Sequence, residues 1–189
     1  MGDEAPESYG LIILSQPAYL TIAKHALTHA GPRIAPDKWR EVYGLLAGRL
    51  TVGNCIVTEA IPFTEGDRES VRFSAGDYAK AAMMTENLAD RNPPEFLAGW
   101  YHSHFIGHEF SGVDVENHLG WQVPNKYAFG LVFDPQELSE SNPGIVILKL
   151  RDVNLGEASP VDKLNFVIQQ VKGKYYTWLQ EYLPGGIWG

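Results

Sequence analysis

The chain has 189 residues, of which 44% are hydrophobic and 12% aromatic, and its formal net charge is −8. This length and composition suit a globular domain with a substantial core. The negative charge argues against a nucleic-acid partner held by phosphate contacts, and the single cysteine, Cys55, excludes an internal disulfide and a cysteine-based zinc site.

The sequence carries no sign of membrane association. It contains no run of about eighteen apolar residues, the length that a membrane-spanning helix needs. Its start is acidic, unlike a secretion signal, and Pro6 stands where a myristoylation motif requires Ser or Thr. We therefore expect a cytoplasmic protein without a membrane partner. Residues 1–8 are polar and are predicted to be a flexible N-terminus.

The first half of the chain predicts interleaved strands and helices. Residues 11–14 predict a strand, and Ser15 with Pro17 begins a helix that runs to about Ala30. The pattern then predicts a helical turn at 36–40, a strand at 41–48, a turn at 52–54, a strand at 55–63, an exposed charged loop at 64–72, and a helix from the Ser74 cap to about residue 89.

Two histidines on the first predicted helix, His25 and His29, are spaced at i and i+4. This spacing can bind a metal ion, but no acidic residue completes a ligand set there. We therefore interpret the pair as part of a solvated helix face.

A second histidine pair ends an apolar and aromatic run at residues 96–104, which predicts a buried strand. Side chains alternate along a strand, so His102 and His104 point to one face and Ser103 to the other. Two imidazoles roughly 7 Å apart along a strand can share one ion.

The stretch Ser111-Gly112-Val113-Asp114 predicts a capping box that opens the next helix, with Ser111 as N-cap. The first turn of such a helix is rigid, which suits it to hold a ligand. Asp114 would add an oxygen ligand to the two histidines. Two His and one carboxylate leave a fourth tetrahedral position for water, as in a catalytic zinc centre. Upstream, Glu41 places a single acid at the mouth of an apolar strand.

The last third of the chain predicts two more strands, at 127–133 and 144–150, joined by a polar loop at 134–143. The whole pattern predicts an α/β or α+β domain, a mixed sheet flanked by helices. Helical spacing of apolar residues then predicts one amphipathic C-terminal helix over 159–183, followed by a frayed tail at 184–189. The spacing leaves open whether this helix packs on its own domain or on another subunit.

Taken together, Glu41, His102-Ser103-His104 and Ser111-x-x-Asp114 resemble the JAMM (MPN+) metalloprotease signature. The stretches Gly-Trp-Tyr-His-Ser-His and Ser-Gly-Val-Asp are most similar to those of the deubiquitinases of the proteasome lid. The resemblance runs from about residue 9 to 151. It implies the MPN fold, which is cytidine-deaminase-like, for a catalytic domain at 9–155.

Two features depart from the family pattern. Phe105 stands where a proline usually follows the second histidine, and nine residues separate His104 from Asp114, one fewer than usual. Because Ser111-x-x-Asp114 is intact, we place the missing residue in the loop at 105–110.

The resemblance implies a chemistry for each residue of the signature. His102, His104 and Asp114 would hold one Zn²⁺ per chain, which lowers the pKa of its water toward neutrality. Glu41 would act as general base on that water and pass the proton to the leaving amine. Ser111 would donate a hydrogen bond to the oxyanion.

The substrate that the resemblance implies is the isopeptide bond between a lysine and the C-terminal glycine of ubiquitin or a ubiquitin-like modifier. An extended Gly-Gly tail can reach a recessed metal because it has no side chains to clash. Such a tail is expected to pair as an added strand along residues 64–73, where Val71 and Phe73 alternate with charges. A second MPN subunit and the proteasome are the partners that the resemblance implies.

Two other functions stay open from the sequence. The chain would be a non-enzymatic MPN scaffold subunit if it binds no zinc and cuts nothing. It would be a JAMM hydrolase of another kind if it acts on a sulfur-carrier-like protein with a Gly-Gly end. Zinc content and activity would distinguish an enzyme from a scaffold. The conjugate that is cut would distinguish an isopeptidase for ubiquitin or a ubiquitin-like modifier from a hydrolase that acts on a sulfur-carrier-like protein.

Overall fold

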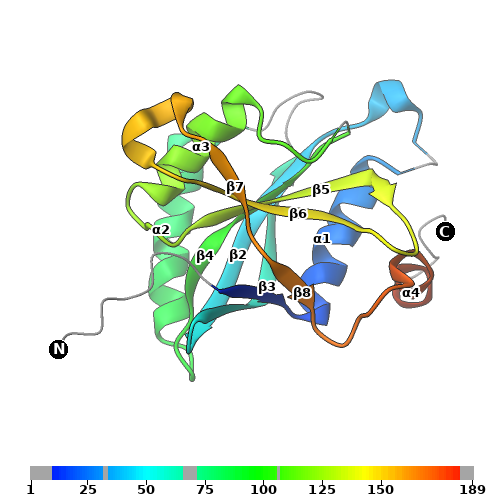
Figure 1. The fold of residues 1–189 in the computed structure, drawn as a ribbon, viewed down its shortest axis with the longest axis horizontal. Coiled ribbons are helices and arrows are strands. Elements are labelled where there is room, and N and C mark those ends of the chain that lie inside the picture. The colour runs from blue at the N-terminus through cyan, green and yellow to red at the C-terminus, as the bar shows by residue number, and fades with distance from the viewer. Residues whose placement is uncertain (1–9, 32–33, 66–71, 106, 184–189) are drawn as a thin grey trace.

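The computed structural model describes residues 10–31, 34–65, 72–105 and 107–183, and within them eight strands form one mixed sheet (Figure 1). The strand order is β7-β6-β5-β4-β2-β3-β1-β8. The strands are β1 Leu11–Leu14, β2 Val42–Thr51, β3 Asn54–Glu65, β4 Phe96–Ser103, β5 Phe129–Leu138, β6 Pro143–Leu150, β7 Val161–Lys163 and β8 Phe166–Ile168. This confirms the predicted α/β architecture, a mixed sheet flanked by helices.

Helices cover both faces of the sheet. They are α1 Gln16–His29, α2 Ala75–Ala89, α3 Gly112–Gln122 and α4 Tyr175–Tyr182, with 3₁₀ turns at Pro36–Lys38 and Val153–Ala158. The larger hydrophobic core lies between the sheet and α1, and a second, aromatic core lies on the face covered by α2 and α3 (Figure 1). Among the described residues, no helix is long and apolar enough to cross a membrane.

Most of the predicted elements are confirmed within a few residues. Ser15 caps α1 by accepting a hydrogen bond from the Ala18 N–H at 3.2 Å, and Ser74 and Asp77 form a capping box on α2. The predicted polar loop at 134–143 is too long, because β5 continues to Leu138 and pairs there with Pro143.

The prediction of one C-terminal helix over 159–183 is wrong. This segment forms β7 and β8 and only then the short helix α4. Gly173 and Lys174 both have positive φ angles, which break a helix. The helical spacing of the apolar residues was misleading because β-branched residues such as Val167 and Ile168 serve a strand equally well.

The segment at 161–168 joins the two ends of the sheet. β7 pairs with β6 and β8 pairs with β1, although only two residues separate them. At this link the Leu164 N–H donates to the Ile147 carbonyl at 2.8 Å, and the Ile12 N–H donates to the Asn165 carbonyl at 2.9 Å. The sheet is therefore curled until both edges are paired by one short stretch of chain.

The C-terminal segment packs on its own domain. Ile168, Val171 and Leu179 are buried in the α1 core, and the Trp178 ring stacks on Tyr19 at 5.9 Å between centroids. The division into residues 9–155 and a C-terminal appendage stays a prediction. The predicted flexible N-terminus at 1–8 and the tail at 184–189 lie outside the described residues, as does most of the loop at 64–72.

The close approach of β4 to β5 depends on Gly99. A Cβ atom at this position would lie 2.0 Å from the Phe129 carbonyl oxygen, a backbone atom that cannot move aside. We expect Gly99→Ala to lower the free energy of unfolding by about 3 kcal/mol, measured by denaturant unfolding. Gly76→Ala is the control, because a Cβ there meets only the Ser74 Oγ at 3.5 Å. Equal stability of the two variants would contradict this account of the β4–β5 contact.

Candidate metal centre

Strand pairing brings Glu41 to the end of the histidine strand. β2 and β4 are antiparallel with Tyr43 opposite His102, and the Val42 N–H donates to the Ser103 Oγ at 3.0 Å. Continuing this register places Glu41 opposite His104. Glu41 is only 6% exposed although it is a carboxylate. The sheet thus holds a buried acid beside a histidine pair that comes much later in the chain, since Val42 and Ser103, which are hydrogen-bonded here, are 61 positions apart.

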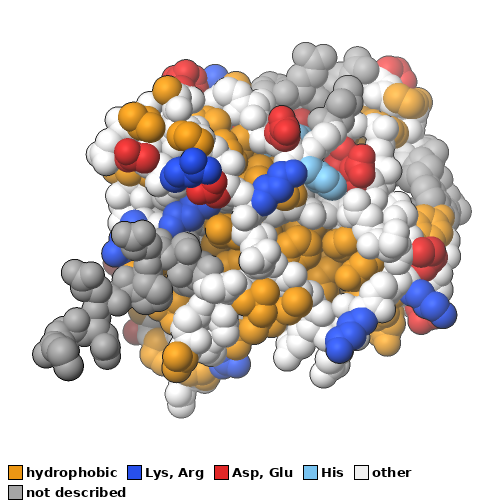
Figure 2. Space-filling view, viewed as in Figure 1, with side chains coloured by type: hydrophobic (Ala, Val, Ile, Leu, Met, Phe, Trp, Pro, Cys, Tyr) orange, Lys and Arg blue, Asp and Glu red, His pale blue; other side chains and the backbone are white. Residues whose placement is uncertain are grey.

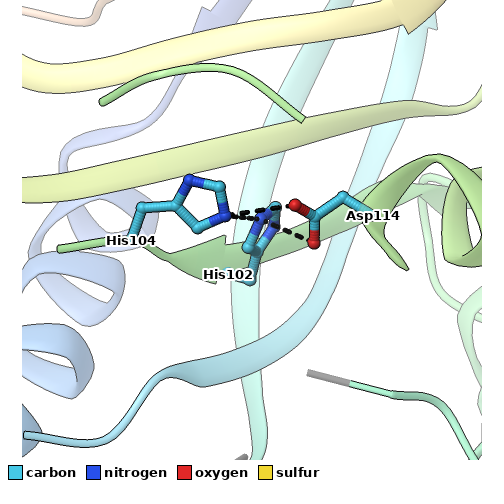
Figure 3. Close-up of side chains that lie close together, drawn as sticks. All are labelled: His102, His104 and Asp114. Carbon is cyan, nitrogen blue, oxygen red and sulfur yellow. Dashed lines mark hydrogen bonds and ion pairs between the residues drawn. The ribbon is translucent and has the colours of Figure 1, made fainter. Parts of the chain in front are cut away.

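The two predicted histidines and Asp114 lie together (Figure 3). The His102 Nε2 lies 3.2 Å from Asp114 Oδ1, and the His104 Nε2 lies 3.1 Å from Asp114 Oδ2. The two Nε2 atoms are 3.0 Å apart. Ligand atoms bound tetrahedrally at zinc–nitrogen distances would be about 3.3 Å apart. The donor types, their burial and their spacing therefore fit a single zinc ion.

The start of α3 fixes the position of Asp114. The Ser111 N–H and hydroxyl both donate to Asp114 Oδ2 at 2.7 Å, and the Asp114 N–H donates back to the Ser111 Oγ at 3.3 Å. Burial raises the pKa of Asp114, but His102, His104 and Ser111 outweigh burial and hold the pKa well below its usual range. Asp114 is therefore ionised and ready to bind a cation.

The two histidines differ in their surroundings. Burial lowers the pKa of the fully buried His102. Burial also acts to lower the pKa of His104, but the hydrogen bond to Asp114 and the charges of Asp114 and Glu41 together raise it. His104 is thus the histidine that an acid solution protonates first, and a protonated imidazole cannot bind metal.

A tryptophan and a third histidine support His102, and the histidine was not among the predicted site residues. The Trp100 ring stacks on the His102 ring at 4.5 Å with an interplanar angle of 12°. The Trp100 Nε1–H donates to the His118 Nδ1 at 3.0 Å. Burial lowers the pKa of His118 to about 3, so its ring is neutral and can accept this hydrogen bond. His118 lies four residues after Asp114, on the same helix face, and that spacing was the available signal.

The other histidine pair does not form a metal centre of this kind. The His25 Nδ1 lies 2.9 Å from the hydroxyl of the buried Tyr101, and burial, then the nearby His29, lowers the pKa of His25 to about 4. The prediction of a solvated helix face is therefore wrong for His25, which is half-buried. Among the described residues, His102, His104 and Asp114 are the group of three that could hold an ion.

Comparisons with known proteins agree with this geometry. The sequence family described as "JAB1/Mov34/MPN/PAD-1 ubiquitin protease" matches residues 7–125. The NAD(+) hydrolase TcpA of Theionarchaea archaeon (strain DG-70-1) is 34% identical over 104 residues, which are 54% of this chain and 30% of that protein.

Two eukaryotic relatives are also similar. COP9 signalosome complex subunit 5 of Debaryomyces hansenii is 30% identical over 103 residues, covering 53% of this chain and 22% of that protein. The 26S proteasome non-ATPase regulatory subunit 14 of Caenorhabditis elegans is 30% identical over 118 residues, covering 60% and 36%. The matched part is thus well under half the length of each of these relatives.

Proposed function

The chain belongs to the JAB1/Mov34/MPN/PAD-1 ubiquitin protease family, and we propose that it is a zinc-dependent isopeptidase. It would remove ubiquitin or a ubiquitin-like modifier from conjugates by hydrolysis after the modifier's C-terminal Gly-Gly. The observation that supports this proposal best is the buried group of His102, His104 and Asp114 with Glu41 beside it.

In this proposal the three ligands supply two neutral imidazoles and one carboxylate. Zinc bound there would lower the pKa of a water ligand and polarise the scissile carbonyl. Glu41 takes the proton of the attacking water and delivers it to the leaving lysine amine. Its burial, at 6% exposure, keeps the carboxylate away from competing solvent.

Ser111 is proposed to donate a hydrogen bond to the oxyanion. Its hydroxyl hydrogen points to Asp114 Oδ2 in the absence of substrate. Because Asp114 Oδ2 also accepts the Ser111 N–H at 2.7 Å, the carboxylate keeps one partner when the hydroxyl turns toward the substrate. The capping box therefore holds the helix start while the hydroxyl is used.

The partners proposed for the chain are modifier conjugates and a larger assembly. Two relatives are named as subunits of the COP9 signalosome and of the 26S proteasome. On this likeness we propose that a second MPN subunit or a proteasome contacts this chain. The expected extension of a peptide strand along residues 64–73 stays a prediction, since residues 66–71 lie outside the described residues.

The proposed function is tested with the purified protein and fluorogenic C-terminal conjugates of ubiquitin and of ubiquitin-like modifiers. We expect one zinc per chain and cleavage that a zinc chelator abolishes. A chain that binds no zinc would contradict the proposal and favour a scaffold. Cleavage of a sulfur-carrier-like conjugate and of no other would support the proposed hydrolysis and identify a different substrate.

The two capping serines offer a matched test of Ser111. Ser111 and Ser74 each cap a helix through the same reciprocal hydrogen bonds with an aspartate three residues later. We expect Ser111→Ala and Ser74→Ala each to lower the free energy of unfolding by about 1 kcal/mol. Only Ser111→Ala is expected to lower kcat as well, by roughly 100- to 1,000-fold. Equal kcat values for the two variants would remove Ser111 from the proposed mechanism.

A further inference from the structure

A buried carboxylate on β5, Asp134, contacts the loop that follows His104. β5 runs beside β4, and the His104 N–H donates to the Phe133 carbonyl at 2.9 Å, which brings the next residue, Asp134, level with the loop that follows His104. Asp134 is only 1% exposed. Its two oxygens accept one backbone N–H each, from Gly107 at 2.9 Å and from Gln136 at 2.8 Å.

Gly107 connects this carboxylate to the metal ligand. The Gly107 carbonyl lies 3.3 Å from the His104 Nδ1, which can donate to it. Gly107 has a φ of +79°, and a Cβ atom there would meet nothing within 4 Å. Its unusual backbone conformation is therefore not imposed by crowding. Two hydrogen bonds hold it instead. The Gly107 N–H donates to Asp134, and the Gly107 carbonyl accepts from His104.

The neighbouring residue adds a second tie between this loop and β5. The Gln136 side-chain amide donates to the Phe105 carbonyl, and the Gln136 N–H donates to Asp134. Residues on both sides of position 106 are thus attached to the same strand. This attachment explains how a loop one residue shorter than usual can still present His104 to the centre.

The hydrogen bond to Gly107 has a chemical consequence for His104. A carbonyl can only accept a hydrogen bond, so this contact places a hydrogen on the His104 Nδ1. The Asp114 carboxylate, 3.1 Å from Nε2, is likewise an acceptor, so a metal ion bound to Nε2 would replace the hydrogen on that nitrogen and leave the one on Nδ1 in place. The Nδ1 of His102, by contrast, is buried without a hydrogen-bond partner among the described residues, and its ring is held by stacking on Trp100.

We propose that Asp134 is a positioning residue for His104. By holding the Gly107 N–H it fixes the Gly107 carbonyl where that carbonyl accepts the His104 Nδ1–H, which keeps the Nε2 lone pair directed at the metal. This inference rests on the proposed metal role of His104. Outer partners of this kind typically change metal affinity by roughly 10- to 100-fold when they are removed.

The test compares Asp134→Asn with a control that removes a similar carboxylate elsewhere. Asparagine has the same shape, but its amide NH₂ cannot accept one of the two backbone N–H groups. The matched control is Asp152→Asn, because Asp152 Oδ1 accepts the N–H of Asn154, two residues on, at 2.9 Å in a separate turn. Gly107→Ala is a second variant, since it disturbs the same link through the backbone alone.

Two measurements are made on each protein. The solvent exchange rate of the His104 Nδ1–H in the zinc-loaded protein, with its ¹⁵N signal assigned by its loss in His104→Gln, reports the hydrogen bond to Gly107. Competition with a chelator gives the Kd for Zn²⁺. We expect a slowly exchanging Nδ1–H in the wild type and in Asp152→Asn, and faster exchange in Asp134→Asn and Gly107→Ala. The Kd should rise roughly 10- to 100-fold in those two variants only.

The outcomes separate a positioning role from a structural one. A lower Tm in Asp134→Asn with an unchanged Kd and a slowly exchanging Nδ1–H would overturn the proposal. If Asp134→Asn does not fold, the same two readouts on Gly107→Ala decide. If the wild type binds no zinc, the proposed function fails, and hydrogen exchange at the Gly107 N–H still decides the link to Asp134. Equal protection of that N–H in Asp134→Asn and Asp152→Asn would overturn it.

Discussion

Replacing Glu41 by glutamine is expected to leave zinc bound while lowering the hydrolysis of an isopeptide conjugate by roughly 100- to 10,000-fold. Glutamine has almost the shape of glutamate, so the pairing of β2 with β4 should persist. Its amide cannot take a proton from water at neutral pH, however. Because Glu41 lies outside the group of His102, His104 and Asp114, its loss should not remove a metal ligand.

The measurements are kcat with a fluorogenic conjugate and zinc content per chain. Glu59→Gln is the control, because Glu59 is a half-buried glutamate on β3 whose carboxylate pairs with Arg91 at 2.7 Å. It should retain both activity and zinc. Full activity in Glu41→Gln would exclude Glu41 as the general base, and loss of zinc in that variant would point to a ligand role instead.

The second large effect is expected at Asp114, which has two roles that can be separated. Asp114 contacts both histidines and also closes the capping box of α3 with Ser111. Asp77 closes the same kind of box on α2 and contacts the Tyr43 hydroxyl at 3.1 Å. Both Asp114→Ala and Asp77→Ala should therefore lose the stability that a cap supplies, about 1 kcal/mol.

Zinc affinity should distinguish these two variants. Asp114→Ala removes a proposed ligand, so its Kd for zinc should rise by more than the roughly 100-fold that outer partners cost. Asp77→Ala should bind zinc as the wild type does. Chelator competition measures the Kd, and thermal unfolding of the metal-free proteins measures the cap. Zinc binding by Asp114→Ala as tight as that by Asp77→Ala would show that the carboxylate is not a ligand.

Much of the candidate site could be predicted because its residues carry strong local signals. His102 and His104 alternate on an apolar strand, and Ser111 with Asp114 has the spacing of a helix cap. The pairing of β2 with β4, which brings in Glu41, has no local signal, and the resemblance to a known signature supplied it. The residues around the ligands were harder to predict from the sequence. Asp134 and His118 act through contacts with distant parts of the chain, and Asp134 was placed in a polar loop.

The prediction of a helix in the C-terminal segment was wrong for a different reason. Apolar residues from 164 to 179 fit a helix by spacing, but β7 and β8 form because two strand edges need partners. No local sequence pattern predicts this pairing, because it depends on β1 and β6 already being in place. Tertiary pairing therefore overrode the local pattern.

The segment at 161–168 sets a limit on how far the chain can be shortened. The family match ends at residue 125, and a chain cut at Arg151 would retain every residue of the proposed centre. Such a chain would lose β7 and β8 together and expose the backbone of β1 and β6 at once. Open strand edges pair with other molecules. We expect the shortened chain to self-associate edge to edge, so the smallest soluble unit extends past the centre to the stretch that closes the sheet.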